Sequence, residues 1–398
     1  MGANVRSGDS RAVGEGWRDA VAALVRDFAR TASERDRAGG TAKRERDLLR
    51  TSGLLSLSIE PRLGGLGGSW NDVLWAVRQL AQVDSSLSHL FGFQHLMLLT
   101  SQLFGAQEQW EQLHRETARE NLFWGNALNP LDSRTRIERE GDGFVLHGTK
   151  SFCSGSVDSD RLIVSALDSG AKLVVAAIPT SRPGVRVLGD WQNMGQRQTD
   201  SGTVELDRVH VAESELLSTP GPLGTTFASL RPLFAQLVLV HVYLGIAEGA
   251  FAVAKDYTRD SRRAWFASGV RSPSQDPYVL RHYGELFVEL EAARLLSERA
   301  GASFQAAWQL GDDLHADTRG AVAVEVASAK VATTRAALDV TARLFEVAGA
   351  SATSAQLNLD RFWRNARTHT LHDPVDYKLR ELGDYALVGH FPTPSFYS

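Results

Sequence analysis

The period at which hydrophobic residues recur changes twice along this chain, and the two changes limit its possible folds. From residue 17 onward, apolar residues recur every three to four positions, as in amphipathic helices. Residues 121–220 instead hold short apolar runs separated by turn residues, as in strands. After this region long helical patterns return. We therefore predict an α+β protein with a helical domain at 1–120, a β domain at 121–220 and a helical domain at 221–398.

The middle domain holds four runs with clear strand character. Tight turns such as Asp142-Gly143 separate them, and short connections of this kind join antiparallel neighbours. We therefore predict one antiparallel sheet in this domain. The predicted strands are Gly143–Leu146, Leu162–Ala166, Leu173–Ile178 and Thr203–Val211.

The C-terminal domain contains one helical stripe, at 327–348, that is almost free of large polar groups. Such a face suits either a central helix of a bundle or an interface between subunits. A longer apolar run, at about 233–254, is interrupted by Gln236, His241 and Glu248. These polar residues favour a buried helix over a membrane span.

Composition and charge exclude several classes of protein. The net charge of −4 gives no reason to expect nucleic-acid binding. The single cysteine, Cys153, rules out an intrachain disulfide, and we interpret it as a small buried residue, not a nucleophile. Residues 1–15 are polar and rich in glycine, which predicts a loose tail and no secretory signal. We expect a cytoplasmic protein with no nucleic-acid or membrane partner.

The segment 361–378 combines four cationic side chains, two histidines and, directly after His372, the acid Asp373. Its polar residues recur at helical spacing as far as His372. Pro374 should end the helix, because proline lacks a backbone N–H and restricts the residue before it. His369, His372 and Asp373 would then lie at a helix end, well placed to face a pocket. The alternative is a solvated basic face with Asp373 as a cap.

His89 is a second candidate, because it opens the apolar segment 89–95. A lone histidine on such a face is more often a satisfied core residue than a catalyst. His89 therefore gains interest only if it meets His369 and His372 in space. With Asp373 these histidines could also suggest a metal site. Two histidines three residues apart are not enough without a placed third ligand, so we predict no metal.

Four motifs resemble the acyl-CoA dehydrogenase superfamily: a Gly-rich loop, a flavin-contacting strand and two further strands. They lie at 61–68, 125–130, 148–155 and 194–202. Over nearly its whole length the chain is most similar to one branch of that superfamily, the reduced-flavin-dependent monooxygenases of the dibenzothiophene monooxygenase type. The most specific segments are 88–92, 152–155, 197–202, 242–247 and 360–378.

This resemblance implies a fold and a reaction. The fold is an N-terminal α-helical domain, a central antiparallel β-barrel and a C-terminal four-helix bundle, with a flavin between barrel and bundle. The reaction uses O2 and FMNH2, which a separate NAD(P)H:flavin reductase supplies. A C4a-hydroperoxyflavin then transfers oxygen to a small aromatic heterocycle. The reacting atom is a dibenzothiophene-like sulfur, giving sulfoxide and sulfone, or an indole-like carbon. A homotetramer is also implied.

The resemblance assigns roles residue by residue. His89, His372 and Ser154 match the catalytic positions near the flavin, where an imidazole can donate or relay a proton near neutral pH. Arg263 is the candidate for the flavin phosphate, because guanidinium pairs with phosphate bidentately. The other matching cofactor residues are Asn126, Phe152, Ser154, Trp191 and Ser201, and the substrate pocket is assigned to Phe91, Phe93, Leu128 and His369.

Three departures from the family pattern concern the substrate and the phosphate. Phe93 replaces a common tyrosine, and Ser351 replaces an arginine that a neighbouring subunit offers to the flavin phosphate. Residues 128–136 differ at the pocket mouth. Two alternatives remain open. An acyl-CoA dehydrogenase would bind FAD tightly and use Asp373 as its base, and a non-catalytic protein would bind flavin without turnover.

Overall fold

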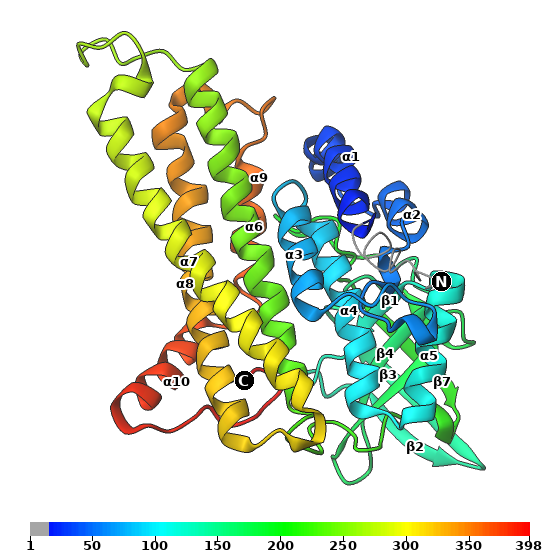
Figure 1. Ribbon diagram of the computed structural model, residues 1–398. Coiled ribbons are helices and arrows are strands. Elements are labelled where there is room, and N and C mark those ends of the chain that lie inside the picture. The colour runs from blue at the N-terminus through cyan, green and yellow to red at the C-terminus, as the bar shows by residue number, and fades with distance from the viewer. Residues whose placement is uncertain (1–15) are drawn as a thin grey trace, which may run out of the picture.

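The computed structural model describes residues 16–398, and its elements follow the predicted order of helices, sheet and helices (Figure 1). Residues 1–15, for which a loose tail is predicted, lie outside the described part. The helices of the N-terminal domain are α1 (Gly16–Ala38), α2 (Lys43–Thr51), α3 (Trp70–Ala81), α4 (Ser85–Phe104) and α5 (Gln107–Glu120). Short 3-10 turns at Leu54–Ser56 and Pro61–Leu63 connect α2 to α3.

Helix α4 forms the centre of this domain and carries His89. Nineteen of its 20 residues are buried. Asp84 caps its N-terminus by accepting a hydrogen bond from the Leu87 N–H at 3.0 Å. Gly92 lets helix α6 (Leu230–Asp260) come close, because a Cβ there would lie 2.4 Å from a side-chain atom of Val238. This packing fixes the helix face on which His89 lies.

The middle domain is one seven-stranded sheet. Its strands are β1 (Trp124–Ala127), β2 (Arg136–Glu140), β3 (Gly143–Lys150), β4 (Arg161–Leu167), β5 (Leu173–Pro179), β6 (Val185–Val187) and β7 (Val204–Val211). The strand order is β1-β4-β2-β3-β7-β6, and β5 pairs with β4. The four predicted strands correspond to β3, β4, β5 and β7 and are confirmed.

The prediction of a purely antiparallel sheet is wrong. Strand β4 pairs in parallel with both β1 and β2, whereas the other four pairings are antiparallel. Short turns correctly indicate the β2–β3 and β4–β5 hairpins, but β1 and β4 are far apart in sequence and no local pattern pairs them. Strand β2 was missed because Ile137 is the one buried residue of its five, so no hydrophobic alternation is visible.

The C-terminal domain is built on three long helices that run side by side (Figure 1). They are α6, α7 (Pro277–Leu310) and α8 (Ala316–Ala348), against which α9 (Asp360–His369) and α10 (Val375–Val388) pack. The apolar stripe of α8 is buried between α6 and α7, which confirms the central bundle helix of the two predicted roles. Helix α6 is long and apolar enough to cross a membrane, but 78% of its most apolar window is buried within the protein, as in a core helix.

Helix α9 ends earlier than predicted. It ends at His369, so His372 and Asp373 lie in the turn that precedes α10. The His369 carbonyl oxygen accepts hydrogen bonds from the Tyr243 hydroxyl at 2.8 Å and from the His372 N–H at 3.1 Å. The chain therefore turns before Pro374 is reached. We call residues 370–374 the α9–α10 turn.

Buried Arg46 joins α2 to two loops of the sheet domain. Its guanidinium donates to Asp200 Oδ2 at 3.0 Å and to the Gly155 carbonyl oxygen at 2.9 Å. It also lies 4.3 Å above the ring centroid of Phe123. The two loops carry Ser154 and Ser201, so this contact positions two predicted site residues.

We expect Gly195→Ala to destabilise the contact between the sheet domain and α9. A Cβ at Gly195 would lie 2.0 Å from the Arg364 carbonyl oxygen, which as backbone cannot swing aside. Overpacking of this kind should lower the free energy of unfolding by about 1–3 kcal/mol, measured by urea denaturation. Gly383→Ala in α10 is the matched control, because a Cβ there meets nothing within 4 Å. Equal unfolding curves for the two variants would contradict this close approach.

Candidate active site

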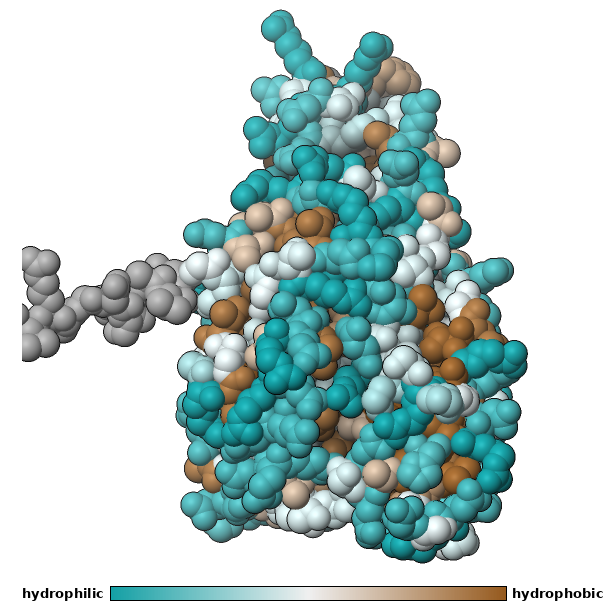
Figure 2. All heavy atoms as spheres, turned by 90° about the vertical axis from the view of Figure 1, so that its right-hand side faces the viewer, coloured by the Kyte–Doolittle hydropathy of each residue, from teal (hydrophilic) through white to brown (hydrophobic). Residues whose placement is uncertain are grey.

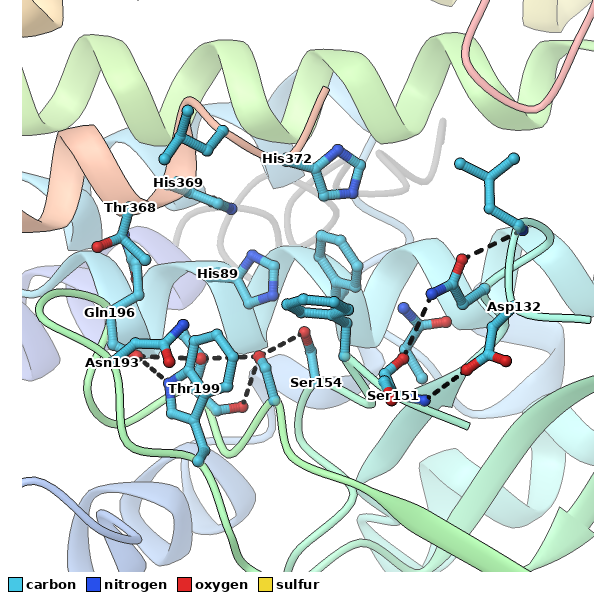
Figure 3. A pocket seen from close by; sticks show the side chains of 18 of the residues that line it. His89, Asp132, Ser151, Ser154, Asn193, Gln196, Thr199, Thr368, His369 and His372 are labelled. Atoms are coloured by element: carbon cyan, nitrogen blue, oxygen red, sulfur yellow. Dashed lines mark hydrogen bonds between the residues drawn. The ribbon is translucent and has the colours of Figure 1, made fainter. Parts of the chain in front are cut away.

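A cavity of about 1060 Å³ opens between α4, the loops of the sheet domain and the α9–α10 turn (Figure 3). All three domains contribute to its wall. Ten predicted site residues line it: His89, Phe93, Asn126, Leu128, Phe152, Ser154, Trp191, Ser201, His369 and His372. Other lining residues were not predicted as site residues, among them Gln196, Thr199, Thr368 and Tyr397. The first three lie inside segments singled out for the family resemblance, whereas Tyr397 carries no sequence signal.

Two predicted site residues do not line the cavity. Phe91 is a core residue with 0% exposure, and its ring centroid lies 4.7 Å from that of His95. The assignment of Phe91 to the pocket is wrong because His89 and Phe93, four residues apart, share a helix face that position 91 does not. Arg263 lies in the connection between α6 and α7, at the end of the bundle away from the sheet (Figure 1). Within one chain it does not face the cavity.

Three histidines from two domains meet on one side of the cavity. The rings of His89 and His369 pack edge to face with centroids 4.7 Å apart, and Phe93 lies 4.0 Å from His89. His372 follows on the α9–α10 turn. Figure 3 shows the three imidazoles grouped together, with Ser154 below them in this view. The spatial meeting that would give His89 a functional interest is therefore present.

Burial keeps two of these histidines uncharged at neutral pH. Burial, with a smaller contribution from His372, lowers the pKa of His89 to about 3. Burial also lowers the pKa of His369 well below its ordinary value. Within residues 16–398, Nδ1 of His89 and both ring nitrogens of His369 have no hydrogen-bond partner. Buried polar atoms are nearly always paired, so a ligand in the cavity would supply the missing partners.

A chain of hydroxyl groups fixes the sheet side of the cavity. The hydroxyl oxygens of Ser154 and Ser201 lie 2.7 Å apart, and Ser201 donates to Thr199 Oγ1 at 2.8 Å. Thr199 and the Trp191 indole N–H both donate to the Gln196 carbonyl oxygen, at 3.0 and 2.7 Å. Because Ser201 gives its proton to Thr199, Ser154 is the donor to Ser201, and its lone pairs remain available to a ligand.

Phe152 and Trp191 form an aromatic wall. Phe152 has a left-handed φ of 60° and is 64% exposed, which is unusual for so large an apolar residue. Its ring centroid lies 6.2 Å from that of Trp191, with the two rings nearly perpendicular. Such rings offer flat faces and apolar edges to a planar ligand.

The cavity fits a flavin ring in size and chemistry. Its volume lies at the upper end of the range of about 300–1,000 Å³ for ligand pockets, which leaves room for a second small molecule. Gln196 Oε1 and Thr368 Oγ1 are further buried atoms with no partner in the described residues. The cavity offers less to the phosphate group of a flavin nucleotide. Arg134 is the one arginine among the described lining residues, and its Nε already donates to Asp132 Oδ1 at 2.8 Å.

Asp373 does not line the cavity, although the acyl-CoA dehydrogenase alternative needs it as a base there. Burial raises the pKa of Asp373, but the Lys330 ammonium, 3.0 Å away, and His372 outweigh burial and hold that pKa well below its usual range. A carboxylate whose pKa is lowered in this way is a weak base, and it does not reach the cavity in which a substrate would lie. Cys153 is also buried, and burial raises the pKa of its thiol to about 12, as fits a small buried residue.

Each of the three domains matches a known protein-family model. Models of the N-terminal, middle and C-terminal domains of acyl-CoA dehydrogenases match residues 14–121, 125–209 and 237–377. The chain therefore belongs to the acyl-CoA dehydrogenase family. This agrees with the helix–sheet–helix order and with a cavity built where the three domains meet.

Within this family, the chain is similar along almost its whole length to several monooxygenases. It is 55% identical over 377 residues to the probable FMNH2-dependent monooxygenase SfnC of Pseudomonas putida, covering 94% of this chain and 95% of that protein. Methanesulfinate monooxygenase MsuC from Pseudomonas fluorescens superposes with a TM-score of 0.95 at 56% identity, over 96% of this chain and 99% of MsuC. The FMN-bound dibenzothiophene monooxygenase TdsC from Paenibacillus superposes with a TM-score of 0.92 at 43% identity, over 98% of this chain and 100% of TdsC.

We expect the buried histidines to make stability fall as the pH drops below 6.5. Between pH 6.5 and about 3 the unfolded chain binds a proton at His89 that the folded chain does not, so the loss begins at the unfolded pKa. By pH 5 this histidine alone accounts for a loss on the order of 2 kcal/mol. Urea denaturation at pH 7, 6 and 5 should show a smaller pH dependence for His89→Gln than for the wild type. The exposed-site variant His390→Gln should keep the wild-type dependence, and an unchanged slope in His89→Gln would contradict a neutral buried His89.

Proposed function

We propose that this protein is the oxygenase component of a two-component FMNH2-dependent monooxygenase that oxidises an organic sulfur compound. One observation carries the proposal. The imidazoles of His89, His369 and His372 meet beside an aromatic wall, in a cavity large enough for a flavin and a substrate. It is supported by identities, along almost the whole chain, of 55% with the probable FMNH2-dependent monooxygenase SfnC, 56% with the methanesulfinate monooxygenase MsuC and 43% with FMN-bound TdsC.

FMN is the cofactor that this function requires, and TdsC has been solved with FMN bound. Phe152 and Trp191 would hold the flavin ring, while Asn126, Ser154 and Ser201 would bind its polar edge. When bound in reduced form, the flavin would supply the electrons that activate O2. The residues around it have simpler tasks, namely to orient the ring, exclude water and control one proton.

His89 and His372 are the residues proposed to control that proton. Neutral His89 can donate from one ring nitrogen and accept at the other, and the half-exposed His372 ring reaches the cavity. Phe93 and Leu128 are buried apolar residues on the same wall and would keep water from the reacting oxygen. The product would be a substrate carrying one oxygen atom from O2, and the other oxygen atom would leave as water.

Two substrate classes fit this proposal. The aromatic heterocycle predicted from the sequence is supported by TdsC, a dibenzothiophene monooxygenase that has also been solved with indole. A small sulfinate is favoured by a different observation. Identity is 56% to the methanesulfinate monooxygenase MsuC and 43% to TdsC. Oxidation at sulfur is common to the sulfinate and the thiophene-type heterocycle.

The proposal includes an NAD(P)H:flavin reductase, a homotetramer and a cytoplasmic location. The reductase follows from the need for reduced flavin. Assembly is supported by the large exposed apolar side chains of α7, which include Tyr278, Phe287, Val288 and Leu295. In contrast, the face formed by the N-terminal helices and the sheet is mostly hydrophilic (Figure 2). A solution mass of a single chain in light scattering would contradict the tetramer.

Turnover under 18O2, with FMNH2 supplied by a reductase, tests the function. Dibenzothiophene, indole and methanesulfinate are offered separately, and products are analysed by mass spectrometry. We expect 18O in the product of at least one of them, only when FMNH2 and O2 are both present. Flavin reduction by an acyl-CoA without 18O incorporation would favour the dehydrogenase alternative. Flavin binding with no product from any compound would favour a non-catalytic protein.

We expect His372→Ala to separate flavin oxidation from product formation. Without this imidazole, no group at position 372 can donate or accept the proton that oxygen transfer requires. General acid–base groups typically contribute at least about 100-fold to the rate of such a step. H2O2 released per FMNH2 should therefore rise, and product per FMNH2 should fall about tenfold or more. His390→Ala, on the exposed C-terminal side of α10, is the control. Unchanged coupling in both His372→Ala and His89→Ala would remove their proposed role.

A further inference from the structure

A buried cluster of polar groups lies behind His372 and outside the cavity. Lys330, in the middle of α8, is 1% exposed. Its ammonium donates to Asp373 Oδ1 at 3.0 Å and to Gln236 Oε1 at 2.9 Å, and the Gln236 amide donates to Asp373 Oδ2 at 3.3 Å. These three groups close a ring of hydrogen bonds between α6, α8 and the α9–α10 turn. Lysine is almost never fully buried unless it is paired, so Lys330 depends on Asp373.

The same carboxylate also orients His372. Asp373 Oδ1 lies 2.9 Å from His372 Nδ1. An ionised carboxylate can only accept hydrogen bonds, so Nδ1 carries the hydrogen. This leaves Nε2 as the nitrogen that can exchange a proton with a molecule in the cavity. A carboxylate that holds an imidazole by Nδ1 is the arrangement by which enzymes fix a histidine tautomer.

Lys330 changes what this carboxylate does to the histidine. An isolated Asp373 anion in the protein interior would strongly favour the imidazolium form of His372. The Lys330 ammonium already neutralises Asp373, so the carboxylate can orient the ring without holding it permanently charged. Asp373 can therefore both orient and balance the ring only because its Oδ1, which holds His372, also accepts a hydrogen bond from Lys330.

We propose that Lys330 is a positioning residue, which acts through Asp373 to fix the tautomer of His372 and to balance the carboxylate charge. Nε2 of His372 is then the ring nitrogen that exchanges a proton with a molecule in the cavity. Lys330 itself touches no molecule in the cavity. The inference rests on the proposed function for its kinetic consequence, but not for the titration of His372.

Titratable groups on every neighbouring element face His372, Asp373 or Lys330. These are His89 on α4, Tyr243 on α6, Lys330 on α8, His369 on α9, Lys378 on α10 and Tyr397 near the C-terminus. His89 and His369 are neutral through burial, and the tyrosines are uncharged at neutral pH. Asp373 and the two lysines are therefore the groups whose charge changes the balance.

The test measures the titration of His372 directly, in the purified full-length protein. Diethyl pyrocarbonate modifies the unprotonated imidazole, and mass spectrometry locates the modified residue. The rate at His372 is measured from pH 5 to 8.5 in the wild type and in Lys330→Met, Asp373→Asn and Lys330→Met/Asp373→Asn. Exposed His390 is the internal reference. Lys255→Met, an exposed site on α6, is the matched control.

We expect the two single variants to shift the midpoint in opposite directions. Lys330→Met leaves Asp373 unbalanced, so the midpoint should rise by about one pH unit or more. Asp373→Asn removes the anion that favours the imidazolium form of His372, so the midpoint should fall. The double variant removes both charges and should return to within about half a unit of the wild type. Lys255→Met should not change it.

A merely structural ion pair would give a different result. It would lower the thermal midpoint of the single variants but leave the His372 titration unchanged, and that outcome in folded protein overturns the proposal. If Lys330→Met does not fold, Asp373→Asn provides the test. A lower midpoint of His372 in that variant supports the proposal, and an unchanged or higher midpoint overturns it. Product per FMNH2 is measured in the same proteins. Opposite titration shifts without any oxygenated product would keep Lys330 in its role and reject the proposed oxygenase function.

Discussion

The buried guanidinium of Arg46 is the contact on which the geometry of the site depends. It comes from a short helix of the N-terminal domain, yet its hydrogen bonds go to Gly155 and Asp200, in two separate loops of the sheet domain. Pulling either loop away would leave a charge or a carbonyl unpaired in the interior, which costs several kcal/mol. Ser154 and Ser201 lie next to these anchors. Their 2.7 Å contact is therefore maintained by a residue that never reaches the cavity.

The site divides its chemistry between domains. The sheet domain supplies hydroxyl groups and the aromatic wall, and the helical domains supply the three imidazoles. The two kinds of group also differ in how they are held. His89 lies on a helix that is buried along its length, whereas His372 lies on a turn whose position depends on Tyr243, Gln236 and Lys330. The buried polar contacts from α6 and α8 thus hold His372 in a fixed position although it lies on a turn.

Periodicity predicted the domains and most elements, because long amphipathic helices and buried strands repeat locally. Periodicity did not predict features that depend on contacts between residues far apart in sequence. The end of α9 depends on Tyr243, 126 residues earlier, and the parallel pairing of β1 with β4 is equally non-local. The family resemblance predicted His89 and His372 as site residues, and both line the cavity. It could not separate Phe93 from Phe91, which helix geometry does. Lys330 lies within the mostly apolar segment 327–348, and nothing in the local sequence indicates that it pairs with Asp373.

The cavity joins segments that are far apart in sequence, and this sets when a cell can first make a working site. A ribosome completes Asn126, Ser154 and Ser201 well before it reaches residues 360–374. During that interval the aromatic wall and the hydroxyl chain exist without His369 and His372. The histidine side of the cavity is therefore the last part of the site to be completed during synthesis, when α9 and the α9–α10 turn dock.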